Sequence, residues 1–182
     1  MDLAIALGQG AGLAVACGLL AGLPLAVAAL AALLLGFDDI GEPGAARALD
    51  DAIVVVVLCV FGAIDAIGEL RLPERVQLGM RAVAGALVFE LVAHDELSWV
   101  GLVLGFVIAG LAATVGVRLL TASARAGSIG SATVLAVAAA AIAAIVSIIP
   151  FAGYVVLITG AFLVVRNRQR SDEKYRGLRI LR

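Results

Sequence analysis

The sequence predicts an all-α polytopic membrane protein with six transmembrane helices. Apolar residues make up 63% of its 182 residues. They lie in six long stretches, and the charges between these stretches alternate in sign along the chain. A soluble fold would leave much of this apolar surface in water, whereas six spans of roughly 20 residues use almost the whole chain. We therefore expect one transmembrane domain, residues 1–165, followed by a basic tail, residues 166–182.

The charges between the stretches predict the orientation. The loop 38–51 holds five acidic residues against one basic residue, Arg47, and the break around Asp95 is acidic again. The breaks near Arg71 and Arg118 are basic, and the tail holds seven of the 13 basic residues. Because positively charged loops stay in the cytoplasm, this pattern predicts a plasma-membrane protein with both termini cytoplasmic. The abundance of Arg over Lys, with much Ala, Gly and Val, is typical of a GC-rich bacterial genome.

The expected helices follow from the apolar stretches and their breaks. They cover residues 10–35, 51–70, 73–93, 99–120, 131–149 and 151–165. We expect Pro24 to bend the first helix, since it removes a helical hydrogen bond. The pairs Gly18/Gly22 and Gly101/Gly105 have the spacing of closely packed membrane helices. The first helix is expected to be retained, because no basic residue precedes it as in a signal peptide.

A faint internal repeat relates residues 1–93 to residues 98–165. Pro73, before the third helix, corresponds to Pro150 before the sixth, although apolar sequence can produce such echoes by chance. Three helices in each half would make the halves inverted relative to one another. This 3 + 3 inverted repeat recurs in transporters, whose sites lie where the repeats meet.

Three ionisable residues within the apolar stretches form a candidate intramembrane polar site: Asp65, Arg81 and Glu90. Asp65 and Arg81 lie roughly 8 and 12 Å inside the cytoplasmic edge, on helices expected to be adjacent and antiparallel. An intramembrane charge favours a partner, so we expect these two to pair. The pair could line a solute pathway or be a structural ion pair. Glu90 shares a helix face with His94 at the outer end, where a solvated interfacial role is the alternative.

The composition argues against catalytic chemistry. One histidine and two cysteines, Cys17 and Cys59, both within apolar stretches, give no catalytic triad and no metal site. We expect no enzyme activity and no cofactor. The basic tail favours contact with anionic lipids of the bilayer rather than nucleic acid. The alanine-rich stretch 131–149 is expected inside the bundle or at a subunit contact, which leaves a homodimer open.

Short segments resemble one known family of small bacterial membrane proteins. They are the surroundings of Asp65, the run from Arg81 to Leu87 and the run from Gly116 to Leu120. On these segments the chain resembles the DUF4126 family, a domain of unknown function. Ala66 and Ile67 stand where the family pattern has lysine and proline. The resemblance implies an integral membrane protein and supplies no activity.

Two functions remain compatible with these features. The first is a small-solute or ion transporter or channel-like bundle, which the repeat, the prolines and the intramembrane charges favour. The second is a non-transporting scaffold or accessory subunit, in which the same charges only hold helices together. A water-accessible groove at Asp65 and Arg81 would favour transport, and a sealed pair would favour the scaffold.

Overall fold

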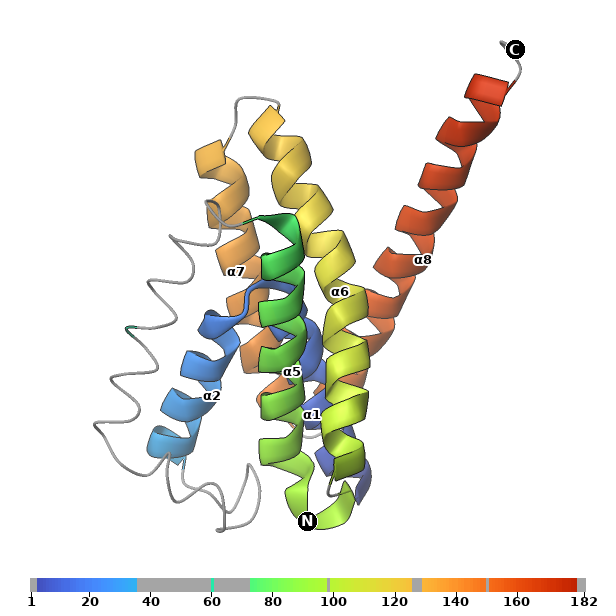
Figure 1. Ribbon diagram of the computed structural model, residues 1–182. Helices are drawn as coiled ribbons and strands as arrows, with labels where there is room; N and C mark the ends of the chain where they lie inside the picture. The colour runs from blue at the N-terminus through green and yellow to red at the C-terminus, as the bar shows by residue number, and fades with distance from the viewer. Residues whose placement is uncertain are drawn as a thin grey trace.

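The computed structural model describes residues 3–35, 60, 73–97, 99–125, 129–149 and 151–179 (Figure 1). Within these residues the regular structure is entirely helical, so the expected all-α class is confirmed. The helices are α1 (Leu3–Leu19), α2 (Gly22–Leu35), α5 (Glu74–Leu97), α6 (Trp99–Arg125), α7 (Ile129–Ile148) and α8 (Ala152–Arg179). The expected helix 51–70, and Asp65 on it, lie outside the described residues apart from Val60.

Helix α1 is the centre of the bundle. It contacts α5, α6, α7 and α8, and every residue from Gly8 to Gly18 is buried. Nine of its 17 residues are glycine or alanine, which lets neighbouring backbones approach closely. A Cβ on Gly18 would lie 2.7 Å from the backbone oxygen of Ala109 on α6, and one on Gly12 would lie 2.8 Å from Cα of Gly153 on α8. Close backbone approach therefore sets the architecture.

The helices alternate in direction around α1. Gly10 contacts Phe89 and Gly18 contacts Arg81, so α1 and α5 are antiparallel. On α8 the order is reversed, since Gly153 lies against Gly8 and Gly160 against Val15, so α1 and α8 are parallel. The start of α1 and the end of α8 consequently lie at opposite ends of the bundle (Figure 1). The expected topology, with both termini on one side of the membrane, is therefore not confirmed.

The first expected helix is two helices. Instead of a bend at Pro24, the chain leaves α1 after Leu19, turns at Leu20 and Ala21, and runs back as α2 (Figure 1). Pro24 is the third residue of α2, in the first turn, where backbone N–H groups have no helical acceptor and a proline loses no hydrogen bond. Pro24 therefore marks a helix start. We call α1, the turn and α2 the helical hairpin; its tip, Leu20 and Ala21, is buried at 2% and 5% exposure.

The expected inverted repeat of residues 1–93 and 98–165 stays a prediction, because residues 36–59 and 61–72 lie outside the described part of the chain. Inversion would make the first helix of residues 1–93 antiparallel to the first helix of residues 98–165. Instead α1 and α6 are parallel, since both are antiparallel to α5, and α1 ends in a hairpin where α6 continues for 27 residues.

Other expected boundaries hold. α5 begins directly after Pro73, whose carbonyl accepts hydrogen bonds from Val76 and Gln77 at 2.9 and 3.1 Å. α6 begins at Trp99, as expected. α7 and α8 are antiparallel, and Phe151 between them adopts a positive φ of 64°, which turns the chain sharply. α8 continues to Arg179, so the basic tail begins as an extension of the last helix.

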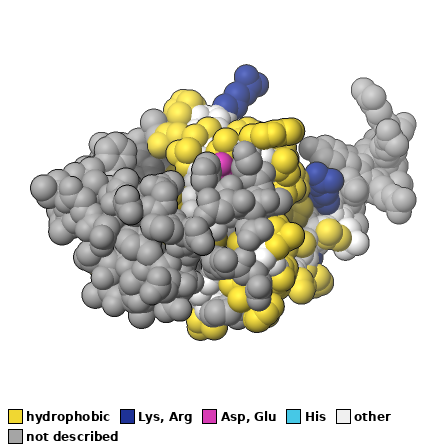
Figure 2. Space-filling model, turned by 90° about the horizontal axis from the view of Figure 1, so that it is seen from below, with side chains coloured by type: hydrophobic (Ala, Val, Ile, Leu, Met, Phe, Trp, Pro, Cys, Tyr) yellow, Lys and Arg dark blue, Asp and Glu magenta, His cyan; other side chains and the backbone are white. Residues whose placement is uncertain are grey.

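Two of the described helices are long and apolar enough to cross a membrane, over Glu74–Ala93 and Trp99–Arg118. The stretches Leu3–Leu19 and Val134–Ile148 are apolar but shorter. Large apolar side chains cover the outer faces of α6, α7 and α8, among them Val103, Phe106, Ile142, Ile158 and Phe162. Seen from the end where α6 begins, the described surface is largely apolar (Figure 2).

Candidate functional site

Arg81 lies at the tip of the helical hairpin, in the middle of the protein. It follows the start of α5 by seven residues and is 0% exposed. Its Nη1 donates a hydrogen bond to the backbone oxygen of Gly18, at 3.4 Å. The guanidinium of α5 thus meets the last turn of α1.

The end of α1 is suited to a cation. The last carbonyls of a helix have no helical donor and carry partial negative charge. Leu20 still donates to the oxygen of Ala16 at 3.2 Å, and beyond it the chain turns. Because the tip is buried, these carbonyls need partners from the protein. Arg81 supplies one at Gly18.

Helix α6 closes the site on another side. A Cβ on Gly116 would lie 2.8 Å from Nη1 of Arg81 and 3.0 Å from the oxygen of Gly18. Glycine at this position therefore makes room for the guanidinium between α1 and α6. Gln77, one turn before Arg81 on the same face of α5, is also buried, at 8% exposure. We call Arg81, Gln77, Gly18 and Gly116 the hairpin-tip site.

The structure separates two of the three residues expected to form one site. Glu90 follows Arg81 by nine residues, which is roughly 13 Å along α5. Its carboxylate is partly buried near the other end, where a Cβ on Gly101 would lie 2.9 Å from Oε2. The side chain of His94 lies outside the described part of the chain. Asp65 does too, so its pairing with Arg81 stays a prediction.

A second polar layer, near the start of α1, was not expected. Nε2 of Gln9 donates to the oxygen of Ile148 on α7 at 2.6 Å, and the hydroxyl of Tyr154 on α8 donates to the oxygen of Ala4 at 2.6 Å. The side chains of Thr114, Ser147 and Thr159 instead donate to carbonyls of their own helices. Those are hydroxyls, which reach the carbonyl three or four residues back. The long amide of Gln9, alone among small neighbours, was the available signal for a bond to another helix.

The side chains of the hairpin-tip site are suited to binding a ligand. A guanidinium provides several fixed donors and keeps its charge, so the hairpin-tip site can hold carbonyl oxygens or an anion. Within the described ranges, His, Cys, Asp and Glu side chains do not gather in groups of three or more that could hold a metal ion.

Comparison of the chain with known protein families, with curated proteins and with solved structures finds no match.

Proposed function

We propose that the protein is an integral membrane protein of the transporter or channel-like type, in which the helical hairpin and Arg81 form the element that controls passage of a small solute or ion. The single observation that carries this proposal is a helix that ends at a buried arginine in the middle of the bundle. Membership of the DUF4126 family stays a prediction.

The membrane placement is supported by the outer surface of the bundle. Two helices have the length and composition of membrane spans, and large apolar side chains face outward. Trp99 and Phe151 are 69% and 58% exposed at the starts of α6 and α8, where an aromatic belt would meet the bilayer surface. We propose that the opposite end, with Arg75, Arg118 and Arg166, faces the cytoplasm, which places the start of α1 outside. This orientation takes the helical hairpin as an element that turns back within the membrane, so that an odd number of spans separates the start of α1 from the end of α8. The six spans expected from the sequence stay a prediction, which this proposal does not adopt.

Labelling of single cysteines in intact cells tests this orientation. In a background with Cys17 and Cys59 replaced by alanine, Trp99→Cys should react with an impermeant reagent added outside, and Arg168→Cys should be protected. The reverse pattern would overturn the proposed orientation.

The functional part of the proposal is supported by the hairpin itself. Within a membrane, a turn at mid-depth is tolerated only where it is buried in protein or lines a water-filled cavity. Broken helices whose ends meet at mid-depth form the substrate and ion sites of many transporters. An ionisable residue at this depth is costly, and it marks a solute or ion pathway in many proteins. Arg81 and the end of α1 combine these features.

Flux through reconstituted liposomes tests transport. The purified chain should accelerate equilibration of at least one solute from a set of potassium chloride, potassium nitrate, potassium phosphate and glycerol, relative to empty liposomes. Arg81→Gln should lower that flux, whereas the exposed Arg75→Gln on the same helix should not. Liposomes containing the protein that behave as empty ones for the whole set would overturn the transport proposal.

A scaffold or accessory subunit is the second candidate, because Arg81 is sealed at 0% exposure and bonded to Gly18. In that case Arg81→Gln would lower the free energy of unfolding, and the wild-type chain would show no flux. The flux assay therefore separates the two candidates.

A further inference from the structure

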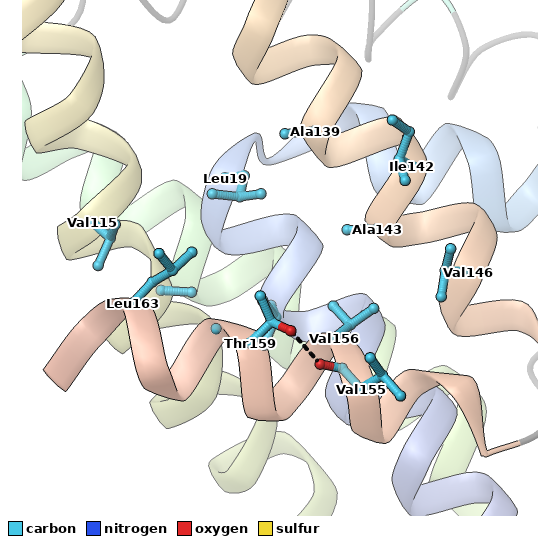
Figure 3. A pocket seen from close by; sticks show the side chains of 13 residues that line it. Leu19, Val115, Ala139, Ile142, Ala143, Val146, Val155, Val156, Thr159 and Leu163 are labelled. Carbon is cyan, nitrogen blue, oxygen red and sulfur yellow. Dashed lines mark hydrogen bonds between the residues drawn. The ribbon is translucent and has the colours of Figure 1, made fainter. Parts of the chain in front are cut away.

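An apolar groove lies between α8 and the rest of the bundle. Its volume is about 330 Å³, and its walls come from α1, α6, α7 and α8 (Figure 3). Every lining residue except Thr159 is apolar or glycine. The Thr159 hydroxyl donates to the oxygen of Val155 at 2.7 Å within its own helix, so it offers little to a polar ligand. The groove is therefore chemically matched to a hydrocarbon chain.

The groove reaches the outer surface of the bundle. Ala139 and Ile142 on α7 and Val155 and Leu163 on α8 line it and are exposed. α8 leans away from the other helices toward its C-terminal end (Figure 1). From Val155 to Leu163 the wall is roughly 12 Å long, which accommodates a substantial part of an acyl chain. A ligand could enter sideways from the bilayer.

Basic side chains stand at one end of this groove. Arg118 lies one turn beyond Val115 on α6, and Arg166 lies one turn beyond Leu163 on α8. Because α6 and α8 run in the same direction, both arginines lie past the same end of the groove. Both side chains are exposed on the surface of the bundle. Arginine forms paired hydrogen bonds to phosphate oxygens.

We infer that this groove is a binding site for one anionic phospholipid, with an acyl chain between α8 and α7 and its phosphate held by Arg118 and Arg166. The inference rests on the membrane placement proposed above, but not on transport. It goes beyond general attraction of the basic tail to the membrane surface, because it names a chain-sized groove and two headgroup contacts. A neutral lipid would fill the same groove without the arginine contacts.

Native mass spectrometry of the full-length protein in detergent, with added phosphatidylglycerol or phosphatidylcholine, tests the site. Each basic residue near a membrane surface contributes enough that removing two should weaken binding about thirtyfold. Arg118→Gln/Arg166→Gln should therefore lose most of the bound phosphatidylglycerol and retain its phosphatidylcholine. Arg168→Gln is the matched control, since residue 168 lies on the opposite side of α8 from the groove, two positions beyond Arg166.

A second pair of variants tests the groove rather than the headgroup. Ala139→Phe places a ring in the groove and should lower binding of both lipids. Ala138→Phe, at an exposed neighbouring position that does not line the groove, should leave both unchanged. Thermal unfolding of each variant identifies any that lose lipid only because they unfold.

The contrary outcomes are distinct. Equal losses for Arg168→Gln and the double variant would show attraction to the tail in general and would overturn the site. A dimer that persists in detergent and is broken by Ala139→Phe would show that a second copy fills the groove. If the protein is extracted from membranes but binds phosphatidylglycerol no better than phosphatidylcholine, the lipid site would be overturned and the membrane placement would stand. A chain that stays soluble without detergent would remove the membrane placement and the lipid site together.

Discussion

Helices α1 and α8 have similarly apolar sequences over their first turns. Their environments differ, because α1 is buried and α8 is largely exposed. α1 is buried from Gly8 to Gly18 and touches four other helices. α8 keeps Val155, Ile158 and Phe162 exposed at 62%, 68% and 61% and leans outward (Figure 1). The two helices differ in side-chain size: α1 is dominated by glycine and alanine, α8 by branched and aromatic residues. In a bilayer, where apolar side chains gain nothing by leaving lipid, it is small size that allows a helix to become central.

The largest expected effect is at the end of α1. Arg81→Met removes the donor to the carbonyl oxygen of Gly18. It should lower the free energy of unfolding in mixed micelles by about 3 kcal/mol, because this buried carbonyl then loses its hydrogen bond from Arg81. Exposed Arg75→Met is the control and should change it by less than about 0.5 kcal/mol. If Asp65 pairs with Arg81, the double variant Asp65→Leu/Arg81→Met should be more stable than Arg81→Met. Equal stability of the single and double variants would contradict that pairing.

Close backbone packing gives the next effect. A Cβ on Gly85 would collide with the Cβ of Ala109 and lie 3.2 Å from the oxygen of Gly105. Gly85→Ala should therefore destabilise by about 1–3 kcal/mol. Gly79, on the same helix, has open space around it, and Gly79→Ala should be neutral or stabilising by up to about 1 kcal/mol. If the two variants unfold at the same midpoint, close packing of α5 at Gly85 would be refuted.

The Tyr154 bond should matter less. Tyr154→Phe keeps the ring against Gly8 but loses the hydrogen bond to the oxygen of Ala4. The loss should be about 1 kcal/mol, because the hydroxyl bond is partly exposed. Tyr154→Ala, which also removes the ring packing, should cost more, and equal losses would assign the whole effect to the hydroxyl.

The smallest effect is expected on the outer face of α8. Phe162→Leu exchanges one exposed apolar side chain for another and should change stability by less than about 0.5 kcal/mol. A loss above 1 kcal/mol, measured by unfolding in mixed micelles, would mean that this face packs against protein.

Much of the fold was predictable, because helix starts carry local signals. Pro73 and Trp99 mark the starts of α5 and α6 in the sequence as in the structure. Pro24 carries the same kind of signal, but a long apolar run predicts one continuous span, and hydropathy does not encode a turn at Leu20. The direction of α1 could not be predicted from the sequence either, because residues 1–37 contain no basic side chain to orient the helix.

The candidate site was predictable only in part. Arg81 stands out as a charge in an apolar stretch, and it is buried as that position implies. Its bond to Gly18 depends on where α1 ends, and this end is set by contacts with helices far along the chain. Gln9 and Ile148, 139 positions apart, likewise meet only because the bundle is complete.

The helical hairpin has a consequence for how the protein is made. With 17 and 14 residues, α1 and α2 each fall short of the roughly 20 that let a segment insert on its own. The contacts that bury α1 come mainly from residues 74–160, which leave the ribosome afterwards. On the membrane placement proposed above, we therefore expect α1 and α2 to reach their final place only after helices α5 to α8 have been made.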